Sequence, residues 1–251
     1  MGGNEMNGWH GWCAPELESE LFPVEHLFSL GEKVVKNDVR EVRRIPLSSG
    51  VFYLKRYFTL RKGQSLRERL AAWMKFHLRG GKARHVLRIT QQMRKAGLGC
   101  PETVLAVWRR MDDSLEEVTL IRELTGTPCH QLWKSEAIPH SELLAKIAAG
   151  LREFHQLGFF HGDCLAGNLC LSPDGQLRFL DNDRTYHTRF FRNRGVTRNL
   201  VQFCSHLWMN GEETECTEFL RSYYGGDAPQ IPHLLSLWRK RSAKLRWERR
   251  R

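Results

Sequence analysis

Three side chains with oxygen donors occur close together in the second half of the chain. Asp163 is followed by Asn168 five residues later, and Asp181 comes thirteen residues after Asn168, at the end of an apolar run. Two carboxylates and an amide on loops that flank one tight hairpin can converge on a single site. Phosphoryl transfer uses such a set, because one carboxylate orients or deprotonates the acceptor hydroxyl while an amide oxygen and a second carboxylate hold Mg²⁺. The sequence therefore predicts a magnesium-dependent phosphotransferase site.

A cation that could hold phosphate groups occurs in the first half of the chain. Lys55 follows the run 51–54, whose β-branched and aromatic residues are typical of a strand. Each residue alone has a simpler interpretation: Asp163 as a turn residue, Asn168 as another, Asp181 as the end of a strand and Lys55 as a solvated strand end. Their combination in this order favours the phosphotransferase interpretation.

Periodicity in the second half predicts the elements that must position these residues. A helix with one buried face is expected to begin at Ser141, as its N-cap, and to end at Gly158. Its buried face comprises Leu144, Ile147, Ala148, Leu151 and Phe154. Two short apolar runs then surround residues 172–175, whose Pro and Asp-Gly predict a hairpin turn. From Leu200 onward the chain is expected to be helical and basic.

The first half is predicted to be rich in strands. Residues 34–57 predict an antiparallel hairpin that ends at Lys55, with its turn at residues 48–50. Residues 1–20 lack periodicity and predict a loosely ordered tail. The segment 59–84 predicts a basic helix with large apolar residues at helical spacing, namely Leu66, Leu70, Trp73 and Leu78. A second helix and two strands follow, at residues 86–98, 104–108 and 118–121.

The composition is that of a basic globular protein. The 251 residues include 39 Lys and Arg against 28 Asp and Glu, a net charge of +11, and 41% are hydrophobic, which excludes wholesale disorder and indicates an anionic partner. Seven cysteines without a Cys-x-x-Cys pair favour reduced thiols over disulfides or a zinc ribbon. Because the sequence has no apolar run of membrane-spanning length and no signal-peptide pattern, we expect a cytosolic protein.

These motifs resemble the protein-kinase-like fold. Among its members, the sequence is most similar to the bacterial lipopolysaccharide-core sugar kinases, which include heptose and Kdo (3-deoxy-octulosonic acid) kinases. The finer resemblance is carried by residues 53–57, the basic segment before 82–84, and residues 97–102, 179–184 and 198–200. It implies an α+β, two-lobed fold, with a tail at 1–20, a small β-rich nucleotide-binding N-lobe at 21–122 and a reduced helical C-lobe at 123–251.

The resemblance also implies a role for each motif residue. Asp163 would be the catalytic carboxylate, Asn168 and Asp181 would hold Mg²⁺, and Lys55 would contact the phosphates of ATP. Residues 120–124, including Glu123, would form the hinge whose backbone contacts adenine. The implied activity is phosphorylation of a heptose or Kdo hydroxyl of the lipopolysaccharide inner core, at the cytoplasmic face of the inner membrane.

The sequence departs from protein kinases in four places. Residues 36–38 stand where a glycine-rich loop is expected, and the predicted helix after residue 82 carries no acid up to Gly99 that could pair with the strand lysine. Asn182 replaces the Phe that protein kinases have after the metal-binding Asp, and no Ala-Pro-Glu follows. These differences argue against a protein substrate and against a phosphorylation-controlled activation segment.

A run of arginines after Asp181 indicates how the acceptor is bound. Guanidinium groups suit phosphate or carboxylate, so we expect an anionic acceptor. The candidate residues are Asp183, Arg184, Arg189 and Arg192, with Arg194 and Arg198 farther along. A solvated basic loop is the alternative. Aminoglycoside kinases share the His-Gly-Asp loop, but their cationic acceptors would need carboxylates, and residues 184–211 contain none.

Other interpretations remain open at this stage. Residues 238–251 fit either a basic helix on an anionic membrane surface or a packed terminal helix with a basic end. The same fold could phosphorylate a protein or another small-molecule hydroxyl, or it could be a non-catalytic pseudokinase that binds nucleotide or nucleic acid. We expect no nucleic-acid partner, and the sequence does not determine the oligomeric state.

Overall fold

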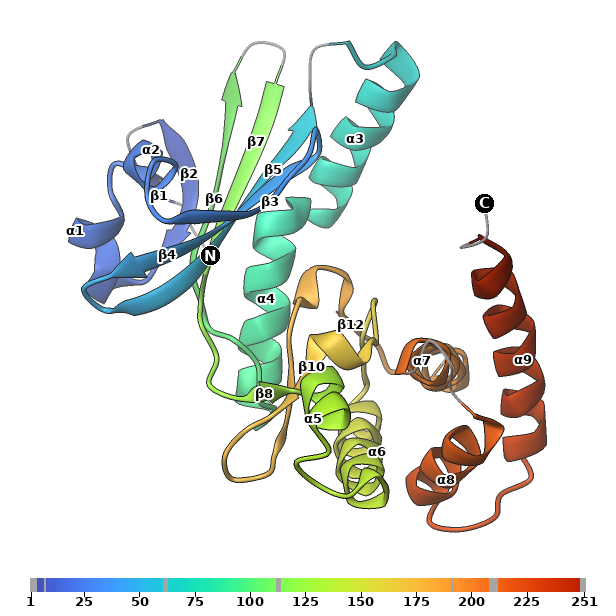
Figure 1. Cartoon of the computed structure of the whole chain (residues 1–251). Helices are drawn as coiled ribbons and strands as arrows, with labels where there is room; N and C mark the ends of the chain where they lie inside the picture. The colour runs from blue at the N-terminus through green and yellow to red at the C-terminus, as the bar shows by residue number, and fades with distance from the viewer. Residues whose placement is uncertain are drawn as a thin grey trace. The chain divides into compact units, whose positions relative to one another are not determined.

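The computed structural model describes residues 4–6, 8–60, 63–111, 114–190, 192–207 and 212–248. The chain forms two compact units (Figure 1). Unit 1 comprises residues 1–92 and 101–124, and unit 2 comprises residues 93–100 and 125–251. The segment 93–100, which the sequence predicts in the N-lobe, therefore belongs to the second unit.

Unit 1 is built on an antiparallel sheet whose strand order is β1-β2-β6-β7-β5-β4-β3. The central strand β7 is buried along nearly its whole length, whereas the edge strand β3 is exposed. The strands are β1 (Asn4–Met6), β2 (Trp9–Cys13), β3 (Glu32–Lys36), β4 (Arg40–Leu47), β5 (Gly50–Leu60), β6 (Thr103–Met111) and β7 (Ser114–Arg122). The predicted hairpin and its turn are confirmed, since Leu47 pairs with Gly50.

The prediction of a loosely ordered tail at residues 1–20 is wrong for Trp9–Cys13. These residues form β2, which pairs with β6. Trp9 is fully buried, and its indole Nε1 donates a hydrogen bond to Glu25 Oε1 at 2.9 Å. A Cβ atom at Gly11 would lie 2.2 Å from the carbonyl oxygen of Ala106, so only glycine fits this close strand pairing. The strand depends on a partner about a hundred residues away, which explains why local periodicity does not predict it.

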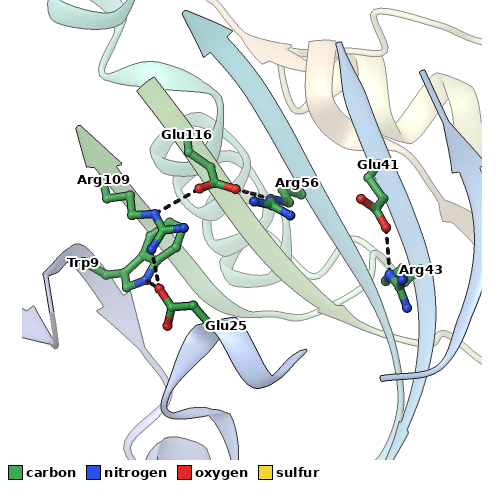
Figure 2. A network of polar contacts seen from close by, with 7 residues as sticks. All are labelled: Trp9, Glu25, Glu41, Arg43, Arg56, Arg109 and Glu116. Atoms are coloured by element: carbon green, nitrogen blue, oxygen red, sulfur yellow. Dashed lines mark hydrogen bonds and ion pairs between the residues drawn. The ribbon is translucent and has the colours of Figure 1, made fainter. Parts of the chain in front are cut away.

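A network of ion pairs fastens the N-terminal segment to the sheet (Figure 2). Glu116, 2% exposed, accepts hydrogen bonds from Arg56 Nε and, at 3.0 Å, from Arg109 Nε. Arg109 also pairs with Glu25, and its guanidinium lies over the Trp9 ring, 4.3 Å from the centroid. A buried carboxylate is tolerated here because two guanidinium groups compensate its charge, and losing both arginines would leave a costly unpaired charge.

The helices of unit 1 include two that the sequence predicts. Helix α3 (Leu66–Arg79) starts with a capping box between Ser65 and Glu68 and ends at Gly80, whose φ is 77°. Helix α4 (Gly81–Lys95) begins where Glu117, 1% exposed, accepts a hydrogen bond from the Ala83 amide at 3.0 Å. A 3-10 turn η1 (Pro15–Leu17) and the short helices α1 (Glu18–Leu21) and α2 (Val24–Leu27) connect β2 with β3.

Unit 2 combines helices with two small antiparallel sheets, β11-β10-β8 and β12-β9. Its helices are α5 (Cys129–Ser135), α6 (His140–Gln156), α7 (Arg192–Leu207), α8 (Glu213–Tyr224) and α9 (Ile231–Glu248). Its strands are β8 (Thr127–Pro128), β9 (Phe159–Phe160), β10 (Leu169–Leu171), β11 (Leu177–Phe179) and β12 (Tyr186–His187). The 3-10 turns η2 (Ala166–Asn168) and η3 (Asn182–Arg184) lie on either side of the β10–β11 hairpin.

Helix α6 confirms the predicted helix, and the five residues of its predicted buried face are all fully buried. Phe154 stacks on Phe179 of β11 with ring centroids 4.0 Å apart, which fastens the helix to the hairpin. The predicted N-cap is wrong by two residues: the first helical hydrogen bond joins the Leu143 amide to the Pro139 carbonyl, so Ser141 lies inside the first turn. Gly158 follows the helix with the left-handed φ of 82° that ends it.

Within the described ranges, every helix is too short or too polar to cross a lipid bilayer. All seven cysteines carry free thiols, and six of them are buried. Burial raises the pKa of the Cys100 thiol to about 12, so this side chain behaves as a small apolar group.

Candidate functional site

The loop that carries Asp163 is closed by its own backbone and by Asn168. The Leu165 amide donates to the Asp163 carbonyl at 2.9 Å, and the Asn168 amide donates to the Leu165 carbonyl at 2.9 Å. Asn168 Nδ2 donates to the Asp163 carbonyl at 2.9 Å and approaches carboxylate Oδ2 at 3.5 Å. The spacing of five residues thus forms a compact loop. Asn168 Nδ2 donates to Asp163, so Asn168 Oδ1 is the atom that could bind a cation.

The hairpin places Asp181 next to this loop. Leu169 pairs with Phe179, and one step farther the Leu180 amide donates to the Asn168 carbonyl at 2.8 Å. Asp181 follows with φ 50° and ψ 58°, a left-handed backbone conformation that is uncommon outside glycine. Such an outlier at the end of a regular strand is a feature of functional sites. The hairpin register therefore brings the Asp181 and Asn168 backbones to the same end of the hairpin.

His161 joins the two halves of the site. Its ring is fully buried, and Nε2 lies 2.8 Å from the Leu180 carbonyl while Nδ1 accepts a hydrogen bond from the Asp163 amide at 3.1 Å. Both bonds form only in the neutral ring with its proton on Nε2. Burial lowers the pKa of His161, which keeps the ring neutral. His161 is thus a fixed spacer between the Asp163 loop and the strand that leads to Asp181.

Helix α7 supports this spacer through Asn199. Asn199 Oδ1 accepts hydrogen bonds from the His161 amide at 2.9 Å and, at 3.1 Å, from His155 Nε2, and Asn199 Nδ2 donates to the His161 carbonyl at 2.6 Å. His155 Nδ1 in turn lies 2.9 Å from the Tyr223 hydroxyl. Residues of α6, α7 and α8 therefore hold the loop through buried hydrogen bonds.

Burial lowers the pKa of His155 to about 4. Because the unfolded chain has the ordinary histidine pKa of 6.5, it binds more protons than the folded chain between pH 6.5 and 4, and stability is lost as pH falls through that window. Lowering the pH from 7.5 to 5 should cost about 2 kcal/mol of unfolding free energy through this group. Urea unfolding at both pH values measures the loss. His155→Gln should show a smaller loss, and an unchanged pH dependence would contradict this assignment.

Close backbone packing fixes the start of the loop. A Cβ atom at Gly162 would lie 2.1 Å from Cβ of Arg184 and 2.3 Å from its carbonyl oxygen, so the chains pass too closely for any other residue. Arg198 Nη2 donates to the Gly162 carbonyl at 2.9 Å. The glycine of the His-Gly-Asp motif is therefore explained by packing against the segment after Asp181.

Gln202 is a site residue that the sequence analysis does not identify. It lies on α7 one turn after Asn199, is 7% exposed, and donates from Nε2 to Asp163 Oδ1 at 2.9 Å. Its Oε1 is buried and has no hydrogen-bond partner among the described residues. The available signal is the spacing of Asn199 and Gln202 on a helix whose neighbouring residues Leu200 and Phe203 are buried and apolar.

Gln202→Leu should lower kcat about tenfold to a hundredfold, since it removes a hydrogen bond to a charged group. The KM for ATP should change little, because Gln202 contacts Asp163 and not the residues predicted to bind the nucleotide. Ser205→Ala, on the same helix and bonded to the Val201 carbonyl, is the matched control. An unchanged kcat in Gln202→Leu would show that the contact is not used.

Lys55 lies in the middle of a strand and is buried. It pairs with Val42 on one side and Thr119 on the other, and β5 continues to Leu60, so the prediction that the strand ends at Lys55 is wrong. Glu117 lies two residues from Thr119, on the face that Lys55 shares. An acid on the same face of the sheet as Lys55 is therefore Glu117 of β7, whereas helix α4 carries no acid.

Glu123 is part of an exposed ion pair. Its amide donates to the Val51 carbonyl at 2.8 Å, and Oε1 accepts hydrogen bonds from Arg44 Nε and from the Tyr53 hydroxyl, both at 3.1 Å. Arg44 lowers the pKa of the Glu123 carboxyl. Because the Glu123 N–H is already paired, a hinge contact with adenine would have to use other backbone groups of this segment.

The members of the arginine run differ in their contacts. Arg192 Nη2 donates to the carbonyls of His155 and Gln156, both at 2.8 Å, and so caps the C-terminus of α6. Arg184 and Arg189 are exposed, and Asp183 is half-buried in η3. The run is thus not a continuous basic loop, because helix α7 begins at Arg192.

Asn182, which replaces the expected Phe, is buried and closes the turn after the strand. Its Nδ2 donates to the Phe179 carbonyl at 2.8 Å, and its Oδ1 accepts from the Thr185 hydroxyl at 2.9 Å. These bonds fix the backbone on both sides of Asp181.

Comparison with known proteins assigns the chain to a family. The sequence model of the lipopolysaccharide kinase (Kdo/WaaP) family matches residues 41–223. The chain belongs to this family. It is therefore a kinase-type phosphotransferase, and ATP is the phosphate donor that membership implies. No curated protein sequence matches the chain.

The solved structure of WaaP confirms the kinase-like α+β fold. The chain is similar to WaaP in complex with acyl carrier protein, with 17% identity and a TM-score of 0.67, over 94% of this chain and 98% of that one. It also matches WbdD in complex with a kinase inhibitor, with 15% identity and a TM-score of 0.47, over 83% of this chain and 44% of that one.

Proposed function

We propose that the protein transfers the γ-phosphate of ATP to a sugar hydroxyl of the lipopolysaccharide inner core, on a heptose or Kdo residue, at the cytoplasmic face of the inner membrane. The observation that carries this proposal is the Asp163 carboxylate, held by Gln202 in a closed loop beside the hairpin end that leads to Asp181. Membership of the lipopolysaccharide kinase family supports the class of acceptor.

The donor set fits Mg²⁺. Within the described ranges, no group of three His, Cys, Asp or Glu could hold a metal ion. Asn168 Oδ1 and the Asp181 carboxylate instead offer two hard oxygen ligands, and Mg²⁺ commonly uses one or two carboxylates together with substrate phosphates. When bound there, Mg²⁺ would neutralise phosphate charge as it develops.

Asp163 orients the acceptor hydroxyl and accepts its proton. The hydroxyl oxygen bonds to the γ-phosphorus, the bond from that phosphorus to the β,γ-bridging oxygen breaks, and ADP leaves. Gln202 holds Asp163 Oδ1 at 2.9 Å, which leaves the acceptor proton to the other lone pairs of the carboxylate. Catalysis then consists mainly of positioning and charge neutralisation.

The remaining residues receive roles by the same proposal. Lys55 contacts the ATP phosphates, and backbone groups near Glu123 contact adenine. Exposed Arg184 and Arg189, with Asp183, bind the anionic acceptor, since guanidinium groups suit its phosphates and carboxylates. Arg192 contributes less to the acceptor site, because its Nη2 already caps α6.

Phosphate transfer to purified inner-core oligosaccharide tests the proposal. Wild-type protein with γ-labelled ATP and Mg²⁺ should label the oligosaccharide, and mass spectrometry should locate the phosphate on heptose or Kdo. Thermal unfolding with ATP, with and without Mg²⁺, separates the alternatives, since an enzyme should be stabilised most by both ligands together. No transfer to any core acceptor, with transfer to a peptide or small alcohol instead, would assign a different substrate.

A further inference from the structure

One side of helix α3 exposes a row of large apolar side chains. The exposed fractions are 84% for Leu66, 56% for Leu70, 44% for Trp73, 44% for Met74 and 83% for Leu78. The spacing of four, three, one and four residues places all five on one side of the helix. In Figure 1, α3 lies beside β5 at the edge of unit 1.

The opposite side of α3 already packs on the sheet. Phe76 makes an edge-on contact with the ring of Trp108, with centroids 6.4 Å apart. The helix is also held by its capping box at Ser65 and Glu68. Exposed apolar groups do not stabilise the unit, and a contiguous row of them on a soluble surface usually marks a binding face.

The charges on and next to the helix are mostly positive. Residues 66–84 contain six Lys and Arg and a single acid, Glu68, whose carboxylate accepts hydrogen bonds from Ser65 at the N-terminus of the helix. Arg67 is exposed between the apolar residues. An apolar row with cations beside it complements an anionic lipid leaflet. In such a leaflet, anionic headgroups lie directly above the apolar acyl chains.

Helix α9, the membrane candidate in the sequence, uses its apolar residues inside the fold. Trp238 is 8% exposed and donates from Nε1 to the Cys204 carbonyl at 3.2 Å, and Leu234 and Leu235 are buried. The packed terminal helix is therefore the better description of this part of α9. The apolar row of α3, in contrast, is exposed and is not part of a core.

We propose that α3 is the surface by which the protein binds an anionic phospholipid membrane. The helix lies in the plane of the leaflet, with Leu66, Leu70 and Trp73 at the acyl boundary and the cations among the lipid phosphates. A second copy of the chain is a poorer occupant, because it would bring the same cations face to face. This inference rests on the proposed function, because it supplies the membrane contact that an enzyme at the inner membrane needs. It can be tested separately, because vesicle binding is measured without any acceptor.

Flotation with lipid vesicles tests the inference. The 251-residue protein should bind mixed phosphatidylcholine–phosphatidylglycerol vesicles and bind phosphatidylcholine vesicles at least tenfold more weakly. Leu70→Ser with Trp73→Ser should reduce binding at least tenfold, and Arg67→Gln should reduce it less. Leu157→Ser, which removes an exposed leucine from unit 2, is the matched control and should bind like wild type. Tryptophan emission should shift to shorter wavelength on vesicles in wild type and shift less in Trp73→Phe.

The outcomes separate this inference from the proposed enzymatic function. The double variant should keep its thermal stability and its phosphate transfer to water-soluble core oligosaccharide, because the replaced side chains are exposed and outside the catalytic loop. Equal binding to both vesicle types, or undiminished binding of the double variant, would overturn the inference. A dimer of the wild-type protein in solution that becomes monomeric in the double variant would also overturn it. So would binding of a purified acidic protein, such as acyl carrier protein, through the same residues in the absence of vesicles.

Discussion

Asp163→Asn is expected to lower kcat for phosphate transfer by about 10²–10⁴-fold, the usual contribution of general acid–base catalysis. The amide has nearly the shape of the carboxylate and can still accept the Gln202 hydrogen bond, but it accepts no proton from the acceptor hydroxyl. The KM for ATP should stay within a few-fold of wild type, since Asp163 is assigned to the acceptor and not to the nucleotide. Initial rates over a range of ATP and core oligosaccharide concentrations give both constants.

Asp174→Asn provides the matched control for Asp163. Asp174 lies in the turn of the β10–β11 hairpin, where it accepts a hydrogen bond from Ser172 and pairs with Arg178 at 3.8 Å. Its replacement repeats the chemical change in the same unit without touching the loop. If Asp163→Asn keeps wild-type kcat, the assignment of this carboxylate fails and the family membership alone remains.

The parts of unit 2 that the sequence predicts are those fixed by local patterns. Helix α6, Gly158 and the β10–β11 turn depend on residues within one turn or one hairpin of each other, and the structure confirms them. The confirmed fold class follows from the same elements taken together with the family resemblance.

The parts that sequence analysis misses depend on contacts between distant segments. Gln202 and Asn199 reach the Asp163 loop across 39 and 38 residues, so nothing near Asp163 in the sequence indicates these contacts. The strand at Trp9 requires its partner β6 in the same way. For α3, periodicity predicts an apolar side, but only the structure shows that this side points outward.

The arginine run shows that charge alone does not assign a role. The sequence treats residues after Asp181 as one basic acceptor loop, yet Arg192 caps α6 and Arg198 holds the Gly162 carbonyl. Guanidinium groups bind backbone carbonyls as readily as they bind anions when a helix C-terminus lies nearby. Arg184, Arg189 and Arg194 are exposed, and for these members of the run the acceptor role stays a prediction.

The two carboxylates that follow the hairpin should differ in their effect on the magnesium requirement. Asp181→Asn should lower kcat about a hundredfold or more and raise the Mg²⁺ concentration needed for half-maximal rate, because a metal ion supplies several kcal/mol of charge stabilisation. Asparagine tolerates the left-handed backbone at this position, so the turn should survive the change. Asp183→Asn, two residues along in η3, should stay within a few-fold of wild type in its magnesium requirement. Titrating Mg²⁺ at saturating ATP compares the two variants directly. Equal losses would contradict the assignment of Asp181 alone as the metal carboxylate. A larger loss in Asp183→Asn would move the proposed ligand from the end of the strand into the turn that follows it.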